Sequence, residues 1–240
     1  MLCFQPDKQG VQEVRNVQKL CIPIVETTIE KALHAIQQVN RWADLIEFRA
    51  DYLKKVNLAP LLESRQKPLI LTNRRKGEGG KYKGDERKRL SVLREAIDLG
   101  SDYIDVELAT ERSLLRGLIG NKGRTQVILS FHDFQRTPSV KELRRLCGQM
   151  TQLGADVVKI VSFARTWEDN LTILSLIPYA RERRQKIVAF CMGEKGKISR
   201  AFSPFLGAAW TYASLNRNKA SAPGQLTVVE IKEIWKTLKL

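Results

Sequence analysis

Eight short apolar segments alternate with stretches of helical periodicity, and this rhythm sets the strongest constraint on the fold. Strands that alternate with helices form a parallel sheet, and eight such units at about this chain length are what a TIM barrel requires. A doubly wound open sheet is the alternative, but the chain has no glycine-rich phosphate turn after its first strand. The expected strands cover residues 19–25, 44–49, 68–72, 103–108, 126–131, 156–161, 186–191 and 209–214.

We therefore predict an α/β fold, a (β/α)8 TIM barrel that forms a single catalytic domain over residues 19–240. Residues 1–18 are polar and without pattern, which predicts a loose N-terminal arm. Asp85 is a good N-cap for a helix that ends near Gly100. The helix that begins near Trp167 is expected to end before Pro178, because proline has no amide hydrogen to donate.

The chain is strongly basic, with 41 Lys and Arg against 26 Asp and Glu and a net charge of +15. Such a charge can attract nucleic acid, but the basic residues are spread over many segments without an aromatic binding platform. We expect no nucleic-acid partner. No apolar run of 18 residues occurs, which argues against a membrane partner. Four scattered cysteines indicate reduced thiols in a cytoplasmic protein.

One lysine lies in the middle of an apolar run, residues 155–161. Burying an ammonium group is costly, and a lysine held partly neutral is a nucleophile for carbonyl carbon. A lysine at a strand edge with its head in water is the competing interpretation. The other strand ends favour a functional role for Lys159, because ionisable residues recur at the carboxyl ends of the strands, where TIM barrels place their active sites.

Residues two positions apart in a strand point to the same face, which adds further side chains to the candidate site. Glu47 and Arg49 are two residues apart and point the same way, as do Asp105 and Glu107. Charged groups at the top of a barrel pair with one another or bind a polar ligand, and we expect Asp105 and Glu107 to serve partly in an internal ion-pair network. His132 ends the fifth strand beside the strand of Lys159, where a histidine can move protons near neutral pH.

Neither a metal nor a cofactor is expected at this site. One histidine at the site, His132, and four distant cysteines do not provide the usual ligands of zinc. Arg49, Arg74 and Lys159 oppose a cation and favour an anionic ligand. No dinucleotide fingerprint or P-loop is present.

Seven short motifs, in order along nearly the whole chain, resemble the type I 3-dehydroquinate dehydratases, the Schiff-base enzymes of the shikimate pathway. This pathway leads to chorismate and the aromatic amino acids. The motifs cover residues 47–51, 72–74 with 78–80, 105–108, 131–134, 158–160, 192–193 with 198–200, and 221–225.

The resemblance implies a lyase that dehydrates 3-dehydroquinate to 3-dehydroshikimate. Lys159 would form the imine with the substrate, His132 would act as general acid and base, and Glu78 would orient His132. The implied substrate-binding residues are Glu47, Arg49, Arg74, Arg200, Ser221 and Gln225. Members of this family are often dimers, which suggests a homodimer.

Two other functions are weighed against this one. A Schiff-base aldolase of the transaldolase type would also place a lysine on a barrel strand, but it more often binds a phosphate after the seventh and eighth strands. A basic barrel that binds RNA without catalysis is the second. RNA affinity that depends on salt and survives the loss of Lys159 and His132 would support it.

Overall fold

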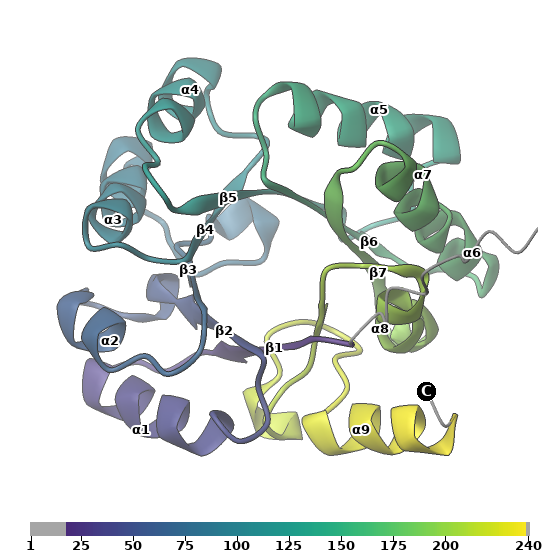
Figure 1. The fold of residues 1–240 in the computed structure, drawn as a ribbon, viewed down its shortest axis with the longest axis horizontal. Coiled ribbons are helices and arrows are strands. Elements are labelled where there is room, and N and C mark those ends of the chain that lie inside the picture. Colours follow the sequence, from purple (N-terminus) through teal and green to yellow (C-terminus); the bar gives the residue numbers. More distant parts are fainter. Residues whose placement is uncertain (1–17, 239–240) are drawn as a thin grey trace, which may run out of the picture.

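The computed structural model describes residues 18–238 and forms a ring of parallel strands with helices outside it (Figure 1). The strands pair in the order β7-β6-β5-β4-β3-β2-β1-β8, and the bond from Ala209 N to Ile187 O links the two ends of the order. The TIM-barrel prediction is confirmed. The strands are β1 (Leu20–Ile24), β2 (Leu45–Arg49), β3 (Leu69–Thr72), β4 (Tyr103–Glu107), β5 (Gln126–His132), β6 (Val157–Phe163), β7 (Lys186–Met192) and β8 (Thr211–Tyr212).

Residues 1–17 of the predicted N-terminal arm lie outside the described residues. No helix within residues 18–238 is long and apolar enough to cross a membrane.

Nine helices of the described chain cover the outside of the ring, and several begin at the caps that the sequence provides. Asp85 accepts from Lys88 N at 3.1 Å and caps α3, while Ser139 and Thr227 form capping boxes with the glutamates three residues on. The helices are α1 (Ile29–Val39), α2 (Ala59–Glu63), α3 (Glu86–Asp98), α4 (Arg112–Gly120), α5 (Val140–Gln152), α6 (Glu168–Leu174), α7 (Leu176–Glu182), α8 (Lys197–Phe202) and α9 (Val228–Thr237).

The prediction of a single helix that ends before Pro178 is wrong. The chain turns at Ser175, where α6 ends and α7 begins, and Pro178 lies in the first turn of α7. Amide hydrogens in the first turn have no carbonyl partner within the helix, so a proline there removes no hydrogen bond.

The strands separate two apolar cores, because alternate residues point into the barrel and out toward the helices. The larger core lies between strands and helices. The smaller one fills the inside of the barrel with residues such as Ile70, Ile128, Val157 and Trp210. Lys159 lies two positions after Val157 in β6, so both side chains point into the barrel. The inside of the barrel is therefore apolar at Val157 and charged at Lys159, which is nearer the carboxyl end of the strand.

Candidate active site

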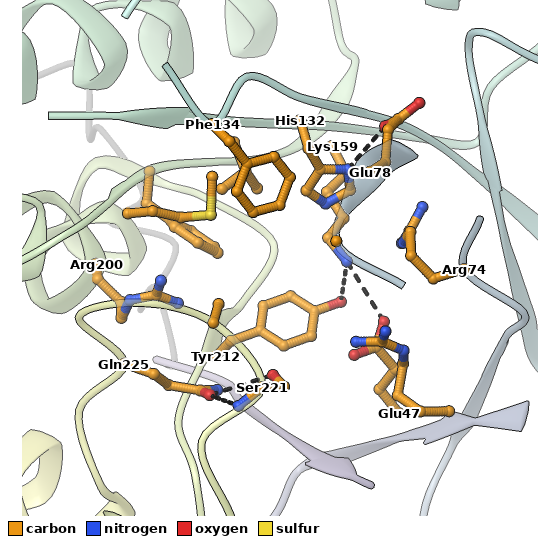
Figure 2. Close-up of a pocket in the computed structure, with 16 residues that line it drawn as sticks. Glu47, Arg74, Glu78, His132, Phe134, Lys159, Arg200, Tyr212, Ser221 and Gln225 are labelled. Atoms are coloured by element: carbon orange, nitrogen blue, oxygen red, sulfur yellow. Dashed lines mark hydrogen bonds and ion pairs between the residues drawn. The ribbon is translucent and has the colours of Figure 1, made fainter. Parts of the chain in front are cut away.

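A cavity that is open to solvent lies at the carboxyl ends of the strands. Figure 2 shows the side chains that line it. All nine residues singled out from the sequence are among them: Glu47, Arg49, Arg74, Glu78, His132, Lys159, Arg200, Ser221 and Gln225. They come from β2, the loop after β3, β5, β6, α8 and the loop before α9, so the barrel brings together groups up to 178 positions apart (225 − 47).

Lys159 lies on the wall of this cavity with 6% of its side chain exposed. Its Nζ donates to Asp105 Oδ2 at 2.9 Å, to Tyr212 Oη at 3.2 Å and to Glu47 Oε1 at 3.4 Å. An ammonium group has three hydrogens to donate, so each is matched by one acceptor. The interpretation of Lys159 as an edge lysine with its head in water does not hold.

Asp105 joins Lys159 to a buried ion-pair network. Its Oδ1 lies 2.8 Å from Arg74 Nη2 and accepts from Ser130 Oγ at 2.6 Å. Burial alone would raise the pKa of Asp105, but the Arg74 and Lys159 cations outweigh burial and hold that pKa well below its usual range. Asp105 is therefore a fixed negative charge beside the amine.

The network continues outward through Glu107, which lies 3.1 Å from Arg74 Nη1 and 2.6 Å from Arg89 Nη1. Arg89 also pairs with Glu86 at 2.8 Å. These groups are a structural brace for Arg74, as expected for Glu107 from the sequence.

His132 and Glu78 form a second polar pair on the same wall. His132 Nδ1 lies 3.0 Å from Glu78 Oε2, and Glu78 comes from the short turn Lys76–Glu78 after β3. Burial raises the pKa of Glu78 to about 7, although Arg74 opposes the shift. Burial, together with the charges of Arg74 and Lys159, lowers the pKa of His132 well below its usual value. At neutral pH the imidazole is therefore uncharged and able to accept a proton.

Arg200 is a buried cation, 1% exposed, whose Nε and Nη2 find no hydrogen-bond partner among residues 18–238. Its guanidinium carbon lies 4.2 Å from the centre of the Phe190 ring. Burial lowers the pKa of Arg200 to about 10, which still leaves it charged at neutral pH. Arg49 differs, because Asp51 holds its Nε and Nη2 in two bonds of 2.8 Å. Buried donors that lack a partner among residues 18–238 and lie beside a cavity point to an anionic ligand.

Ser221 and Gln225 lie in one loop over the cavity, and they are bonded to each other. Gln225 Oε1 accepts from Ser221 N at 2.7 Å and from Ser221 Oγ at 3.2 Å. The same loop is held against the end of β7 by the bond from Gly193 N to Pro223 O at 3.1 Å. At Gly224 a Cβ atom would lie 2.1 Å from Gly193 O, so this approach requires glycine.

Seven residues that line the cavity were not identified from the sequence as site residues, and two of them, Phe134 and Tyr212, contact the residues proposed for catalysis. Phe134 stacks beside His132 with ring centres 6.3 Å apart. Tyr212 contacts Lys159 from β8, which is two residues long, so its apolar pattern was too short to show which residue faces inward. The position of Tyr212 in the second half of the predicted strand 209–214 was the available signal.

Residues 20–240 match the sequence profile of a family described as Type I 3-dehydroquinase. The chain belongs to this family. It is 36% identical over 225 residues to a 3-dehydroquinate dehydratase of Methanocaldococcus jannaschii, with 92% of this chain and 99% of that protein covered.

Solved structures of the family share the fold. A type I 3-dehydroquinate dehydratase of Clostridium difficile, solved with covalently modified comenic acid, aligns with a TM-score of 0.83 at 27% identity over 92% of both chains. The Enterococcus faecalis enzyme aligns with a TM-score of 0.80 at 31% identity, covering 92% of this chain and 93% of that one. The family activity is that of 3-dehydroquinate dehydratase, a hydro-lyase of the shikimate pathway, and the resemblance inferred from the seven motifs is confirmed.

Proposed function

We propose that this 3-dehydroquinase dehydrates 3-dehydroquinate to 3-dehydroshikimate through an imine on Lys159. The observation that carries the proposal is the contact of a nearly buried Lys159 Nζ with both a carboxylate pair and an open cavity. The amine attacks the ketone carbon and water leaves, which gives a protonated imine. This group draws electrons from the neighbouring carbon and makes its hydrogen acidic.

His132 is the proposed general base and acid. Its uncharged ring takes the acidified proton, and a proton is then returned to the departing hydroxyl so that water leaves. Glu78 accepts from Nδ1–H, which keeps Nε2 free as the basic nitrogen and stabilises the imidazolium that forms. Hydrolysis of the imine releases 3-dehydroshikimate and restores Lys159.

Arg200 is the proposed partner of the substrate carboxylate. The carboxylate would supply the acceptors that Nε and Nη2 lack among the described residues. Glu47, Arg49 and Arg74 are proposed to hold the ring hydroxyls. Ser221 and Gln225 are proposed to close over the ligand, which keeps bulk water from the imine.

The activity itself is tested by following the absorbance of the conjugated product formed from 3-dehydroquinate. We expect product with the wild type and no detectable product with Lys159→Ala. Lys186→Ala is the matched control, because Lys186 is exposed at the opposite end of β7 and lies outside the cavity. Turnover by Lys159→Ala at the wild-type rate would overturn the proposal.

We also propose that residues 19–240 form the whole catalytic domain. A variant that lacks residues 1–18 should then keep its activity.

A homodimer is proposed because members of this family are often dimers, and light scattering of the purified protein tests the oligomeric state. A cytoplasmic location agrees with the free, buried Cys21, Cys147 and Cys191, and cell fractionation tests it.

A further inference from the structure

Tyr212 contacts Lys159 Nζ together with Asp105 and Glu47, and none of the catalytic steps proposed above uses its hydroxyl. Its Oη lies 3.2 Å from Nζ, and Nζ lies 4.4 Å from the centre of the tyrosine ring. Figure 2 shows the hydroxyl end of Tyr212 directed at Lys159 from the side of the cavity nearer Arg200. The residue is 4% exposed and lines the cavity, so its hydroxyl is within reach of a ligand bound to Lys159.

The other two groups at Nζ are the carboxylates of Asp105 and Glu47. An ionised carboxylate only accepts hydrogen bonds, whereas a phenol both accepts and donates. Burial, together with the negative charges of Glu47 and Asp105, raises the pKa of Tyr212 well above its usual value. The phenol is therefore protonated at neutral pH. Of the three groups it is the one that can donate toward an oxygen beside Nζ.

Imine formation requires such a donor. When an ammonium and a ketone give a protonated imine and water, two of the three nitrogen-bound protons leave with the carbonyl oxygen and the third stays on nitrogen. After one proton leaves the ammonium, the nitrogen lone pair forms the C–N bond while a C=O electron pair moves to oxygen. After a second proton leaves nitrogen, its electron pair forms C=N while the C–O bond breaks and water departs. Two protons must therefore travel from the nitrogen to the oxygen that is bonded to the same carbon of the carbinolamine.

We propose that the Tyr212 hydroxyl is a further catalytic residue that relays one proton between Lys159 Nζ and the oxygen of the carbinolamine. It accepts a proton from Nζ and gives its own to the oxygen, so it ends each step as a neutral phenol. The reverse relay serves hydrolysis of the product imine. This inference rests on the proposed imine at Lys159.

Tyr212→Phe is the informative variant, because it removes the hydroxyl and keeps the ring against the Lys159 amine. The groups that face Tyr212 and could change its effect on pH are Lys159 of β6, Glu47 of β2, Asp105 of β4, Cys21 of β1 and Arg200 of α8. Tyr179→Phe is the matched control, since Tyr179 lies on α7 away from the cavity and packs against Arg183.

The experiment mixes each enzyme rapidly with 3-dehydroquinate, quenches with borohydride at set times and measures the reduced adduct on Lys159 by mass spectrometry. We expect Tyr212→Phe to form the adduct at least tenfold more slowly at every pH, with the midpoint of the pH dependence unchanged. Tyr179→Phe should match the wild type. Melting curves check folding, and Tyr212→Met serves as a second variant without a hydroxyl if Tyr212→Phe is unstable.

Two results would overturn the relay while leaving the imine intact. The adduct could form at the wild-type rate in the variant, or the midpoint could shift while the limiting rate stays the same, which would assign Tyr212 a purely electrostatic role. Absence of any adduct on Lys159 in the wild type would instead remove the proposed imine itself, so the two failures are distinguishable.

Discussion

His132 Nδ1 lies 3.0 Å from Glu78 Oε2, with 10% and 11% of the two side chains exposed. The pair spans 54 positions of sequence and is assembled by the turn after β3 and the end of β5. This contact determines which nitrogen of the imidazole faces the cavity, and with it the ability of His132 to act as a base. The first two predictions follow from it.

Replacing Glu78 with glutamine should lower kcat by about tenfold. The amide oxygen still accepts from Nδ1–H, but a bond to a neutral acceptor is weaker than a bond to a carboxylate by about 1–2 kcal/mol when the imidazolium forms. Steady-state kinetics measure the effect. Glu182→Gln, a change on the exposed surface of α7, is the control and should behave as the wild type. A kcat unchanged in Glu78→Gln would show that the pair plays no part in proton transfer.

Activity of the wild type should fall as the pH drops below about 7. Burial raises the pKa of Glu78 to that value, so the carboxyl takes up a proton there as pH falls. A protonated Glu78 donates to Nδ1 and shifts the imidazole proton to Nε2, the nitrogen needed as the base. In Glu78→Gln this titration is absent and the acid limb should move to lower pH. If the acid limb of the pH–activity profile were the same in the wild type and in Glu78→Gln, the titrating group would not be Glu78.

Arg200→Met should lower kcat/KM by roughly 10- to 100-fold. The variant loses the charge-assisted hydrogen bond to the substrate carboxylate, and such a bond contributes about 1.5–3 kcal/mol. The same change should raise the melting temperature, because it removes a buried cation whose Nε and Nη2 lack partners within residues 18–238. Kinetics and thermal denaturation measure the two effects on one variant. A lowered melting temperature together with an unchanged kcat/KM would mean that Arg200 is structural.

Asp105→Asn should lower the free energy of unfolding at pH 7 by about 3 kcal/mol, since it leaves Arg74 and Lys159 short of a buried counter-charge. The native pKa of Asp105 is depressed, so its stabilisation is present above the unfolded pKa and is lost as pH falls. The difference between variant and wild type should therefore narrow below about pH 4. Denaturant titration tests this. Glu194→Gln, which breaks an exposed ion pair, should change stability by less than 1 kcal/mol.

Much of the barrel and of its site could be predicted from the sequence, because both depend on local rules. Strand periodicity indicated the eight strands, and parity placed Glu47 with Arg49 and Asp105 with Glu107 on the same face. Placing the site at the carboxyl ends of the strands then brought Lys159 and His132 together. Both placements follow from the two-residue period of side chains along a strand and from the common direction of the strands in a parallel sheet.

What the sequence did not indicate depends on contacts between distant segments. The lack of hydrogen-bond partners at Arg200 Nε and Nη2 among residues 18–238 follows from packing that no local pattern records. Tyr212 was missed because β8 is only two residues long and because the distance from Tyr212 to Lys159 depends on how β8 closes the barrel beside β1. The helix break at Ser175 depends on how α6 and α7 pack against β7.

Reduction with sodium borohydride in the presence of 3-dehydroquinate, followed by peptide mass spectrometry, tests directly whether the imine forms on Lys159. A reduced imine is a stable secondary amine, so we expect a mass increase on the peptide that contains Lys159, and none in Lys159→Ala or without substrate. An enzyme that turns over 3-dehydroquinate while Lys159 stays unmodified under borohydride would contradict it.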